Sequence, residues 1–360
     1  MANNFDLSAL ALKAVCPNNE ILYDDKGMPS IMVKVPKMTY AQLGLGASTD
    51  VFPAFIVNGQ EVDEIYISKY QNIVMNGRAY SLPGQDPKTT ITFDTALKAC
   101  TDKGAGWHLM TAQEWAAIAL WCKKNGTMPK GNNDYGKDHA DSIYQAIPTS
   151  KDGERTGRVA TGTGPLSWSH DGTPSGIWDL NGNVWEWQGG MRTVKGELQI
   201  LANNNGADSA HPQTAASAEW KAIDASDGSL ITPDGNGTTS GSVKMDWISS
   251  HCQYSTTITV QEDAGRGCTF ESVTCDSTIS DAAKLLLQAL GMFKYDSTAG
   301  AYNGDYFYFN NGAAERCFNR GGFWSHGASA GVFLSNGYDP RSRAYGSIGF
   351  RSAFVKLPAA

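Results

Sequence analysis

The stretch Arg320–Phe354 near the C-terminus limits which folds the chain can adopt. It reads RGGFWSHGASAGVFLSNGYDPRSRAYGSIGFRSAF. Its framework residues are mostly small ones that allow close backbone approach or large ones that fill a core. They are Gly321, Gly322, Trp324, Gly327, Ala330, Gly331, Ile348, Gly349, Phe350 and Arg351. The residues between them share no charge, size or polarity, which is typical of a binding surface on a rigid scaffold. The alternative is a glycine-rich terminal loop and strand without a binding role.

The composition indicates a folded, loop-rich protein. Of the 360 residues, 18% are charged and 39 are glycine, which favours a mostly β or α+β protein over a helical bundle. The net charge of -7 argues against general affinity for nucleic acids or membrane surfaces. Residues 1–14 lack a basic segment followed by an apolar one, and no stretch is apolar for the length of a membrane span. We therefore expect neither a standard secretory signal nor membrane insertion.

The seven cysteines are odd in number, scattered, and contain no Cys-x-x-Cys motif. This spacing gives little support to structural zinc, so we expect most of them to be buried thiols. Cys252, Cys268 and Cys275 share one loop-rich stretch. A disulfide there is an option if the protein reaches the outside of a cell.

Short apolar runs with turn residues between them begin at Glu20 and predict strands and hairpins, with a further strand over 62–70. A helix is predicted over Thr95–Cys100 with Asp94 as its cap. Thr111 and Glu114 form a capping box, which predicts a second helix ending at Gly126.

Ser280 is predicted to cap another helix over 281–290. Two neighbouring helices followed by a long stretch without helices indicate an α+β rather than an α/β fold. We therefore predict an N-terminal segment over 1–20 and one domain over 21–360. The domain contains a loop-rich insertion at about 193–300 and the ligand-binding region at 320–354.

The most specific internal motif is Gly176–Trp187, which reads GIWDLNGNVWEW. The chain also contains HLMTAQEW at 108–115, RGGFW at 320–324 and GFR at 349–351. These motifs, in this order, resemble the formylglycine-generating-enzyme type of C-type lectin fold. The resemblance implies a loop-rich α+β domain with two main helices and small antiparallel sheets.

Members of that family that oxidise a substrate cysteine have a cysteine pair near the C-terminus that binds copper, since soft thiolates select Cu(I). The corresponding region here, residues 336–348, contains no cysteine, and Cys317 is alone in its neighbourhood. We therefore predict a protein that is not an enzyme. A copper oxidase of the formylglycine-generating type is the alternative.

A closer resemblance exists within the same superfamily. The spacing RGGxW, GxxAGVF and IGFRxA resembles the variable region of proteins diversified by diversity-generating retroelements, among them phage receptor-binding proteins. In that family, error-prone reverse transcription randomises the adenines of a template repeat. The positions that match its diversified sites are Phe323, Ser325, His326, Ser329, Ser335, Gly337, Tyr338, Asp339, Arg341, Arg343, Tyr345, Gly346 and Ser347.

The segment Asn181–Glu186 resembles a calcium site of the enzyme relatives. The resemblance implies side-chain ligands from Asn181 and Glu186 and carbonyl ligands from Gly182 and Val184, all of them hard oxygens suited to Ca²⁺. The alternative is a turn in which Glu186 caps a backbone donor. The sugar-binding motifs of calcium-dependent animal lectins are absent from the sequence, so sugar binding through calcium is not supported.

These observations predict a ligand- or receptor-binding protein whose C-terminal surface is diversified to recognise varying cell-surface targets. The partner would be a cell-surface protein or glycan, contacted from a virion, at a phage tail tip, or from a cell surface. In this interpretation the ligand meets three kinds of side chain. Contact area comes from Phe323, His326, Tyr338 and Tyr345, forked donors come from Arg341 and Arg343, and hydrogen bonding is tuned by Ser325, Ser329 and Asp339. An invariant glycan-binding lectin or adhesin is a further alternative.

Overall fold

The computed structural model describes residues 4–358, so residues 1–3 of the predicted N-terminal segment lie outside the described residues. Within that range the α-helices are α1 (Asn4–Val15), α2 (Phe93–Thr101), α3 (Ala112–Asn125) and α4 (Asp281–Ala289). Short 3-10 helices occur at Ala41–Leu43, Pro53–Phe55, Leu166–Trp168, Asn205–Ala207, Phe270–Ser272 and Gly327–Ser329. No helix in this part of the chain is long and apolar enough to cross a membrane.

A smaller sheet joins segments from the beginning, the middle and the end of the chain. Its strands are β1 (Asn19–Tyr23), β2 (Pro29–Pro36), β5 (Glu64–Ser68), β8 (Trp107–Leu109) and β23 (Ser352–Phe354). They run in the order β1-β2-β5-β23-β8, and each neighbouring pair is antiparallel. The predicted strands after Glu20 and over 62–70 are therefore confirmed, and the last strand lies between β5 and β8.

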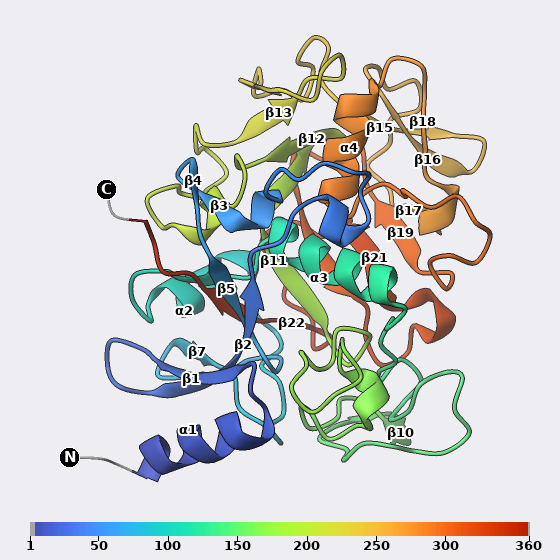
Figure 1. Cartoon of the computed structure of the whole chain (residues 1–360). Helices are drawn as coiled ribbons and strands as arrows, with labels where there is room; N and C mark the ends of the chain where they lie inside the picture. The colour runs from blue at the N-terminus through green and yellow to red at the C-terminus, as the bar shows by residue number, and fades with distance from the viewer. Residues whose placement is uncertain (1–3, 359–360) are drawn as a thin grey trace.

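A larger sheet crosses the molecule in the order β17-β19-β21-β20-β11-β12-β15-β16-β18 (Figure 1). These strands are β11 (Trp185–Val194), β12 (Glu197–Ile200), β15 (Lys244–Ile248), β16 (His251–Ser255), β17 (Arg266–Thr269), β18 (Thr274–Cys275), β19 (Tyr306–Phe309), β20 (Arg316–Gly321) and β21 (Gly331–Gly337). The short strand β22 (Ile348–Phe350) pairs in parallel with β11, and β13 (Lys221–Ile223) pairs with β12 and β14 (Leu230–Ile231).

Three small hairpins lie outside the two sheets in the described chain. They are formed by β3 (Ile56–Val57) with β4 (Gln60–Glu61), by β6 (Ile73–Met75) with β7 (Arg78–Tyr80), and by β9 (Lys151–Asp152) with β10 (Arg155–Thr156). Residues 193–300, where we predicted an insertion, contain β12 to β18 and α4, whose strands continue the larger sheet. The division into segment, domain and insertion stays a prediction.

The helices begin where the capping signals stand in the sequence. The Thr111 hydroxyl accepts from the Glu114 amide, and the Glu114 carboxylate accepts from the Thr111 amide, so the predicted capping box of α3 is confirmed. The Ser280 cap of α4 is confirmed as well. The predicted cap of α2 is wrong, because Thr92 caps that helix and Asp94 lies in its first turn.

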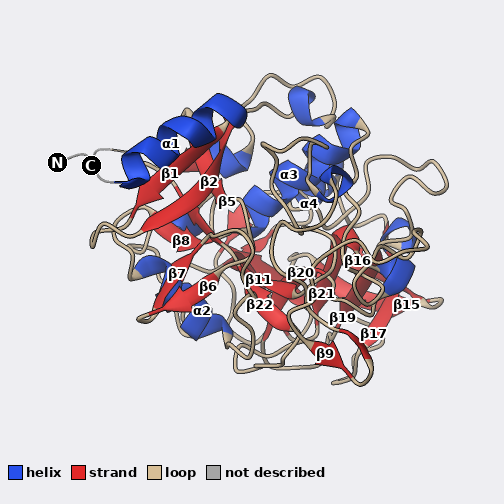
Figure 2. Ribbon diagram, turned by 90° about the horizontal axis from the view of Figure 1, so that it is seen from below, coloured by secondary structure: helices blue, strands red, loops and turns tan. Residues whose placement is uncertain are grey.

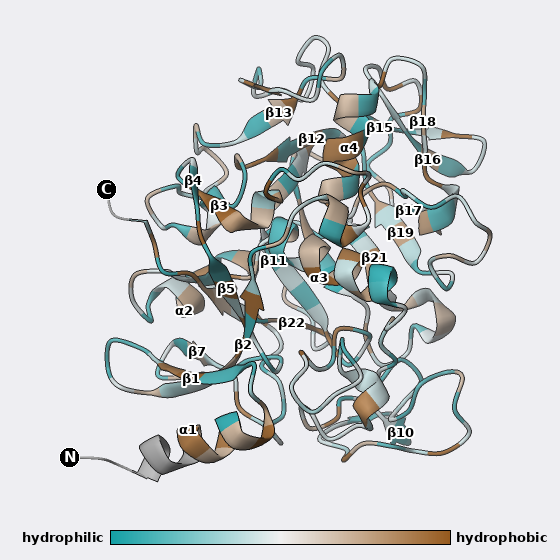
Figure 3. Cartoon of the chain, in the orientation of Figure 1, coloured by the Kyte–Doolittle hydropathy of each residue, from teal (hydrophilic) through white to brown (hydrophobic). Residues whose placement is uncertain are grey.

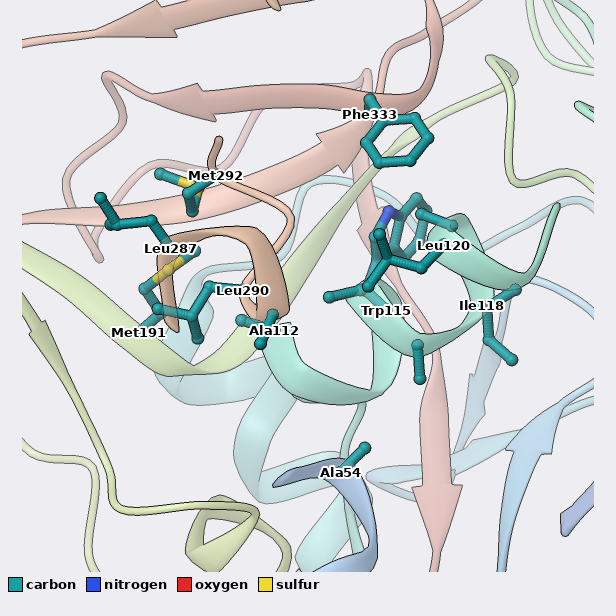
Figure 4. Packing of buried hydrophobic residues seen from close by; sticks show 14 of the residues in the cluster. Ala54, Ala112, Trp115, Ile118, Leu120, Met191, Leu287, Leu290, Met292 and Phe333 are labelled. Carbon is teal, nitrogen blue, oxygen red and sulfur yellow. The ribbon is translucent and has the colours of Figure 1, made fainter. Parts of the chain in front are cut away.

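Helices α3 and α4 lie side by side on one face of the larger sheet (Figure 2). Figure 4 shows the core between them, where Trp115 of α3 meets Phe333 of β21, while Leu287 of α4 and Leu290, the residue after that helix, lie on the side of Ala112. The Trp115 indole nitrogen also donates to the Val332 carbonyl at 2.7 Å. This contact fixes α3 to the strand that runs through the predicted binding region.

A second cluster lies on the other side of β11 and β21. It combines α2 residues such as Phe93 with Trp187, Leu334 and Phe350. At the edge of the molecule, the described part of α1 carries apolar residues (Figure 3), of which Leu10 and Val15 are 68% and 72% exposed.

Candidate ligand-binding site

The loop after β20 is held by glycines and by one tryptophan. Gly321 and Gly322 have φ angles of +85° and +86°, a region that L side chains rarely adopt. A Cβ atom on Gly322 would also lie 2.9 Å from the Cβ of Ala330. The Trp324 indole donates to Asp152 Oδ2 at 2.9 Å, and its carbonyl accepts from the Tyr135 amide at 2.7 Å. The backbone of this loop is therefore fixed independently of its outward side chains.

Two buried arginines, Arg320 of β20 and Arg351 directly after β22, make hydrogen bonds in the interior of the protein. Arg320 donates to the carbonyls of Leu290 and Gly291 at 2.8 and 3.0 Å. Arg351 donates from Nε and Nη2 to Glu186 at 2.5 and 2.6 Å, and both side chains are almost fully buried. Arg351 also donates to the Ser68 carbonyl in the smaller sheet, so it connects the two sheets.

A hollow of about 460 Å³ lies against strands β19 and β21, and we call it the aromatic cleft. Its lining consists of Trp185, Tyr306, Tyr308, Phe323, His326, Ser329, Leu334, Asn336, Tyr338, Asp339, Tyr345, Ser347 and Ile348. Aromatic rings meet edge to face along its walls, with centroids 4.8 Å apart for Trp185 and His326, and 5.4 Å apart for Tyr308 and Tyr338. Such a concave, largely aromatic surface can enclose an apolar group and exclude water from it.

The alternation of side chains along β21 decides which residues reach the cleft. Phe333 and Ser335 face the core beside α3 and α4, where the Ser335 hydroxyl contacts the Met292 sulfur at 3.5 Å. Leu334 and Asn336 face the opposite side and line the cleft. The same rule separates Tyr306 and Tyr308 of β19, which line the cleft, from the buried Phe307.

The carboxylate and the histidine that line the cleft leave no unpaired charge in it. The Asp339 carboxylate accepts from the side-chain amides of Asn319 and Asn336 at 3.0 and 2.9 Å, and from Arg343 Nε at 3.1 Å. Burial lowers the pKa of His326 to about 4, so its ring is neutral at pH 7. The cleft therefore offers hydroxyl groups and aromatic surface, and its one carboxylate is already paired.

Seven of the predicted ligand-contacting residues are brought together in the cleft: Phe323, His326, Ser329, Tyr338, Asp339, Tyr345 and Ser347. Ser325, Arg343 and Gly346 lie beside it and do not line it. Arg343 still contributes indirectly, because it donates to Asp339 and to the Tyr345 hydroxyl.

Three of the predicted residues lie elsewhere for clear reasons. Ser335 is fully buried on the core side of β21, and Gly337 is buried against the Phe318 ring. Arg341 donates to both oxygens of Glu315 at 2.7 and 2.9 Å and to Asp94 at 2.6 Å. In this arrangement Ser335 and Gly337 do not reach the cleft, and the Arg341 guanidinium is paired with carboxylates of the protein itself.

Sequence reasoning missed Tyr306 and Tyr308, because it looked for ligand contacts only within residues 320–354. The run YFYF carries the signal, since alternation places both tyrosines on one face of a strand. Trp185 and Trp187 both belong to the second core cluster. Trp187 is fully buried and donates to the Ile91 carbonyl, while Trp185 lies in the floor of the cleft.

Most of the predicted calcium ligands surround the side-chain amide of Gln71. The carbonyls of Gly182 and Val184 and the Glu186 carboxylate accept from Nε2 of Gln71 at 3.4, 3.1 and 3.0 Å. The fourth oxygen of this set is the Asp179 carbonyl at 3.1 Å, whereas the Asn181 side chain bonds to Asn133 and to the Pro129 carbonyl. With an amide nitrogen at their centre and Arg351 on Glu186, the residues present do not fit a calcium ion in this arrangement.

The cysteines do not fit a copper centre either. All seven are free thiols, and Cys252, Cys268 and Cys275 form no bridge in the structure. Cys317 is 1% exposed, and burial raises the pKa of its thiol far above the ordinary value. No cysteine is among the residues that line the cleft, and within residues 4–358 no group of three or more His, Cys, Asp or Glu side chains could hold a metal.

Comparison with solved structures gives distant matches. PvdO from Pseudomonas aeruginosa is 14% identical and matches over 93% of this chain and 97% of its own, with a TM-score of 0.36. Treponema denticola variable protein 1 is 10% identical over 93% and 98% of the two chains, with a TM-score of 0.31. The P3c variant of the Major Tropism Determinant is 11% identical over 93% and 71%, with a TM-score of 0.30.

No curated protein matches the chain. A family model described as the sulfatase-modifying factor enzyme 1-like domain matches residues 37–223. That range holds just over half of the 360 residues and includes the motifs at 108–115 and 176–187. The predicted α+β class and its C-type-lectin-like fold of the formylglycine-generating type are confirmed. The chain belongs to the family of sulfatase-modifying factor enzyme 1-like domains.

Proposed function

We propose that this protein binds a ligand non-covalently in the aromatic cleft. The observation that carries the proposal is the cleft itself, a hollow of about 460 Å³ with aromatic walls on two neighbouring strands. Its backbone is fixed by Gly322, Trp324 and Arg351, none of which is among the lining residues. Outward side chains can therefore change with little effect on the fold, so specificity and stability are separated.

The chemistry of the cleft favours an uncharged, largely apolar group of the ligand. Tyr306, Tyr308 and Tyr338 present ring surface and hydroxyls, which suits amphipathic contacts. The planar polar groups of Asp339 and Asn336, which could hold a pair of sugar hydroxyls, already bond to each other. This favours a large apolar side chain of a protein target over a glycan.

The partner in this proposal is a protein on a cell surface, recognised from a virion or from another cell. The lining residues of the loops 323–329 and 338–347 would be diversified by a retroelement, while the framework between them is kept. The support is the alternation of framework and unlike residues over 320–354 together with the placement of seven of those unlike residues in one cleft.

Binding to intact target cells tests the recognition. The double variant Tyr308→Ala/Tyr338→Ala should lose most cell binding and keep its melting temperature within a few degrees. Tyr144→Ala is a matched control, because Tyr144 is 64% exposed and does not line the cleft. Equal binding by the double variant and the control would remove the cleft as the binding site. Loss of binding after glycan removal, with no loss after protease treatment of the cells, would instead identify a glycan target.

Diversification has a separate test in the surrounding DNA. We expect a reverse transcriptase gene beside a near-copy of the codons for residues 320–354 that differs at adenines. Sequencing of the gene from many members of one population should then find substitutions at the cleft-lining positions and constancy at Gly321, Trp324 and Arg351. A constant stretch with no near-copy would leave an invariant binding protein.

The family match favours one second candidate, since the family is named for an enzyme that modifies sulfatases. A cysteine-oxidising activity would need a thiol at the cleft, and the buried Cys317 is not among its lining residues. Oxygen consumption with a cysteine-containing peptide and Cu(I) tests this candidate. Turnover that Cys317→Ser abolishes would establish it in place of the binding function.

A further inference from the structure

We infer that Gln71 does the structural work of a cation in the loop Asp179–Glu186, because its amide nitrogen gathers four oxygens of the kind that a hard cation binds. We call the carbonyl oxygens of Asp179, Gly182 and Val184 together with Glu186 Oε1 the oxygen ring. They lie 3.1, 3.4, 3.1 and 3.0 Å from Gln71 Nε2. A side-chain amide has two N–H donors, so four acceptors around one nitrogen exceed its donor capacity.

The loop backbone is bent so that these oxygens converge. Asp179, Gly182 and Asn183 all have positive φ angles, of +64°, +79° and +61°, which are uncommon for residues other than glycine. Gly182 has no alternative, because a Cβ there would lie 2.1 Å from the Asn132 carbonyl oxygen. Strained backbone is kept only where the surroundings enforce it, and here it aims the carbonyls of the loop at one point.

The orientation of the Gln71 amide is fixed by its neighbours. The Val159 amide donates to Asn183 Oδ1 at 2.9 Å, and Asn183 Nδ2 donates to the Val159 carbonyl at 3.2 Å. Asn183 must therefore present Nδ2 to Gln71, whose Oε1 accepts from it at 2.8 Å. Since Oε1 faces Asn183, Nε2 faces the oxygen ring, and the opposite orientation would put like atoms against each other at both ends.

The second role of a cation, neutralising charge, is taken by Arg351. Its two short hydrogen bonds to Glu186 pair the carboxylate inside the core. Gln71 thus gathers the oxygens and Arg351 supplies the positive charge. One polar atom of this loop is unpaired, since the buried Asp179 Oδ1 has no hydrogen-bond partner within the described chain.

The arrangement bears on the aromatic cleft through β11. The loop runs directly into Trp185, which lies in the floor of the cleft, and β22 pairs with β11 at Trp185 and Glu186. Gln71 comes from the loop after β5, far from these residues in the sequence. It is therefore a positioning residue that holds the floor of the cleft without a metal.

Gln71→Glu tests the inference, since it keeps the shape of the side chain and replaces the amide nitrogen with an oxygen. The carboxylate oxygen that replaces Nε2 would lie about 3.0–3.4 Å from the ring oxygens, which is the separation expected of neighbouring ligands around one calcium ion with Ca–O distances of about 2.4 Å. The wild-type melting temperature should be the same in EDTA and in millimolar calcium. Gln71→Glu should melt about 5–10 °C lower in EDTA and recover at least half of that loss in calcium.

Gln188→Glu is the matched control, because Gln188 is fully buried and its amide donates to the carbonyls of Glu186 and Trp187 from outside the ring. It should be destabilised equally in EDTA and in calcium. A calcium-dependent melting temperature in the wild type would overturn the inference. So would a Gln71→Glu variant that is as stable as the wild type, or one that calcium does not rescue. If Gln71→Glu cannot be folded in EDTA, refolding in calcium supports the inference, and failure to refold in either condition overturns it.

Discussion

At the scale of single residues, Arg341 was predicted to donate hydrogen bonds to a ligand, but in the structure it donates to carboxylates of the protein itself. Its side chain is 17% exposed and bonds to Glu315 and Asp94. We expect Arg341→Ala to lower the free energy of unfolding by about 2 kcal/mol, because Glu315 loses one of its two arginines in a half-buried site. Urea denaturation measures the loss. Arg343→Ala is the control, with an expected change below about 1 kcal/mol. A loss as small as this for Arg341→Ala would show that Arg341 is not structural.

His326 makes stability depend on pH at the same scale. Its folded pKa of about 4 lies below the ordinary value of 6.5, because burial opposes the charged ring. A depressed folded pKa contributes stability that is fully present above pH 6.5 and is lost as the pH falls from 6.5 toward 4. The loss should reach about 3 kcal/mol by pH 4. Urea denaturation across this range should find a shallower acid slope in His326→Gln, and an unchanged slope would assign the acid sensitivity to other groups.

At the scale of elements, β19 divides fold from function along one strand. Phe307 is fully buried while Tyr306 and Tyr308 line the cleft. Phe307→Ala should lower the free energy of unfolding by about 3–5 kcal/mol, because it leaves a cavity in the core. Tyr308→Ala should cost less than half as much and should weaken ligand binding. Thermal unfolding and cell binding of the two variants measure both effects, and the reverse pattern would mean that the strand faces the other way.

The elements also explain how far the sequence could predict this structure. Helix α3 was predictable because Thr111, Glu114 and Gly126 carry its start and stop within one local segment. The C-terminal framework was predictable because small and aromatic residues recur there at fixed spacing. The membership of the cleft was not, since it depends on the parallel pairing of β19 with β21 and on which face each residue takes. The role of Gln71 was equally hidden, because its partners lie more than 100 residues away.

At the scale of the whole molecule, the end of the chain closes both sheets. Strand β23 lies between β5 and β8, and Ala353 at its centre pairs with Ile67 on one side and His108 on the other. Arg351, just before it, bonds to Ser68 in the smaller sheet and to Glu186 in the larger one. Segments from the start, middle and end of the chain therefore depend on one short strand, which predicts that they unfold together.

Ala353→Pro tests that dependence, since proline removes a backbone donor and fits poorly in the middle of a sheet. We expect a loss of about 3 kcal/mol or more in unfolding free energy, together with weaker ligand binding, because β22 and the cleft floor lie directly before β23. Circular dichroism at rising temperature should record one earlier transition. Lys356→Pro is the control, because Lys356 is exposed and outside the strands. Two separate transitions in Ala353→Pro would mean that the sheets unfold independently and that the cleft does not depend on the end of the chain.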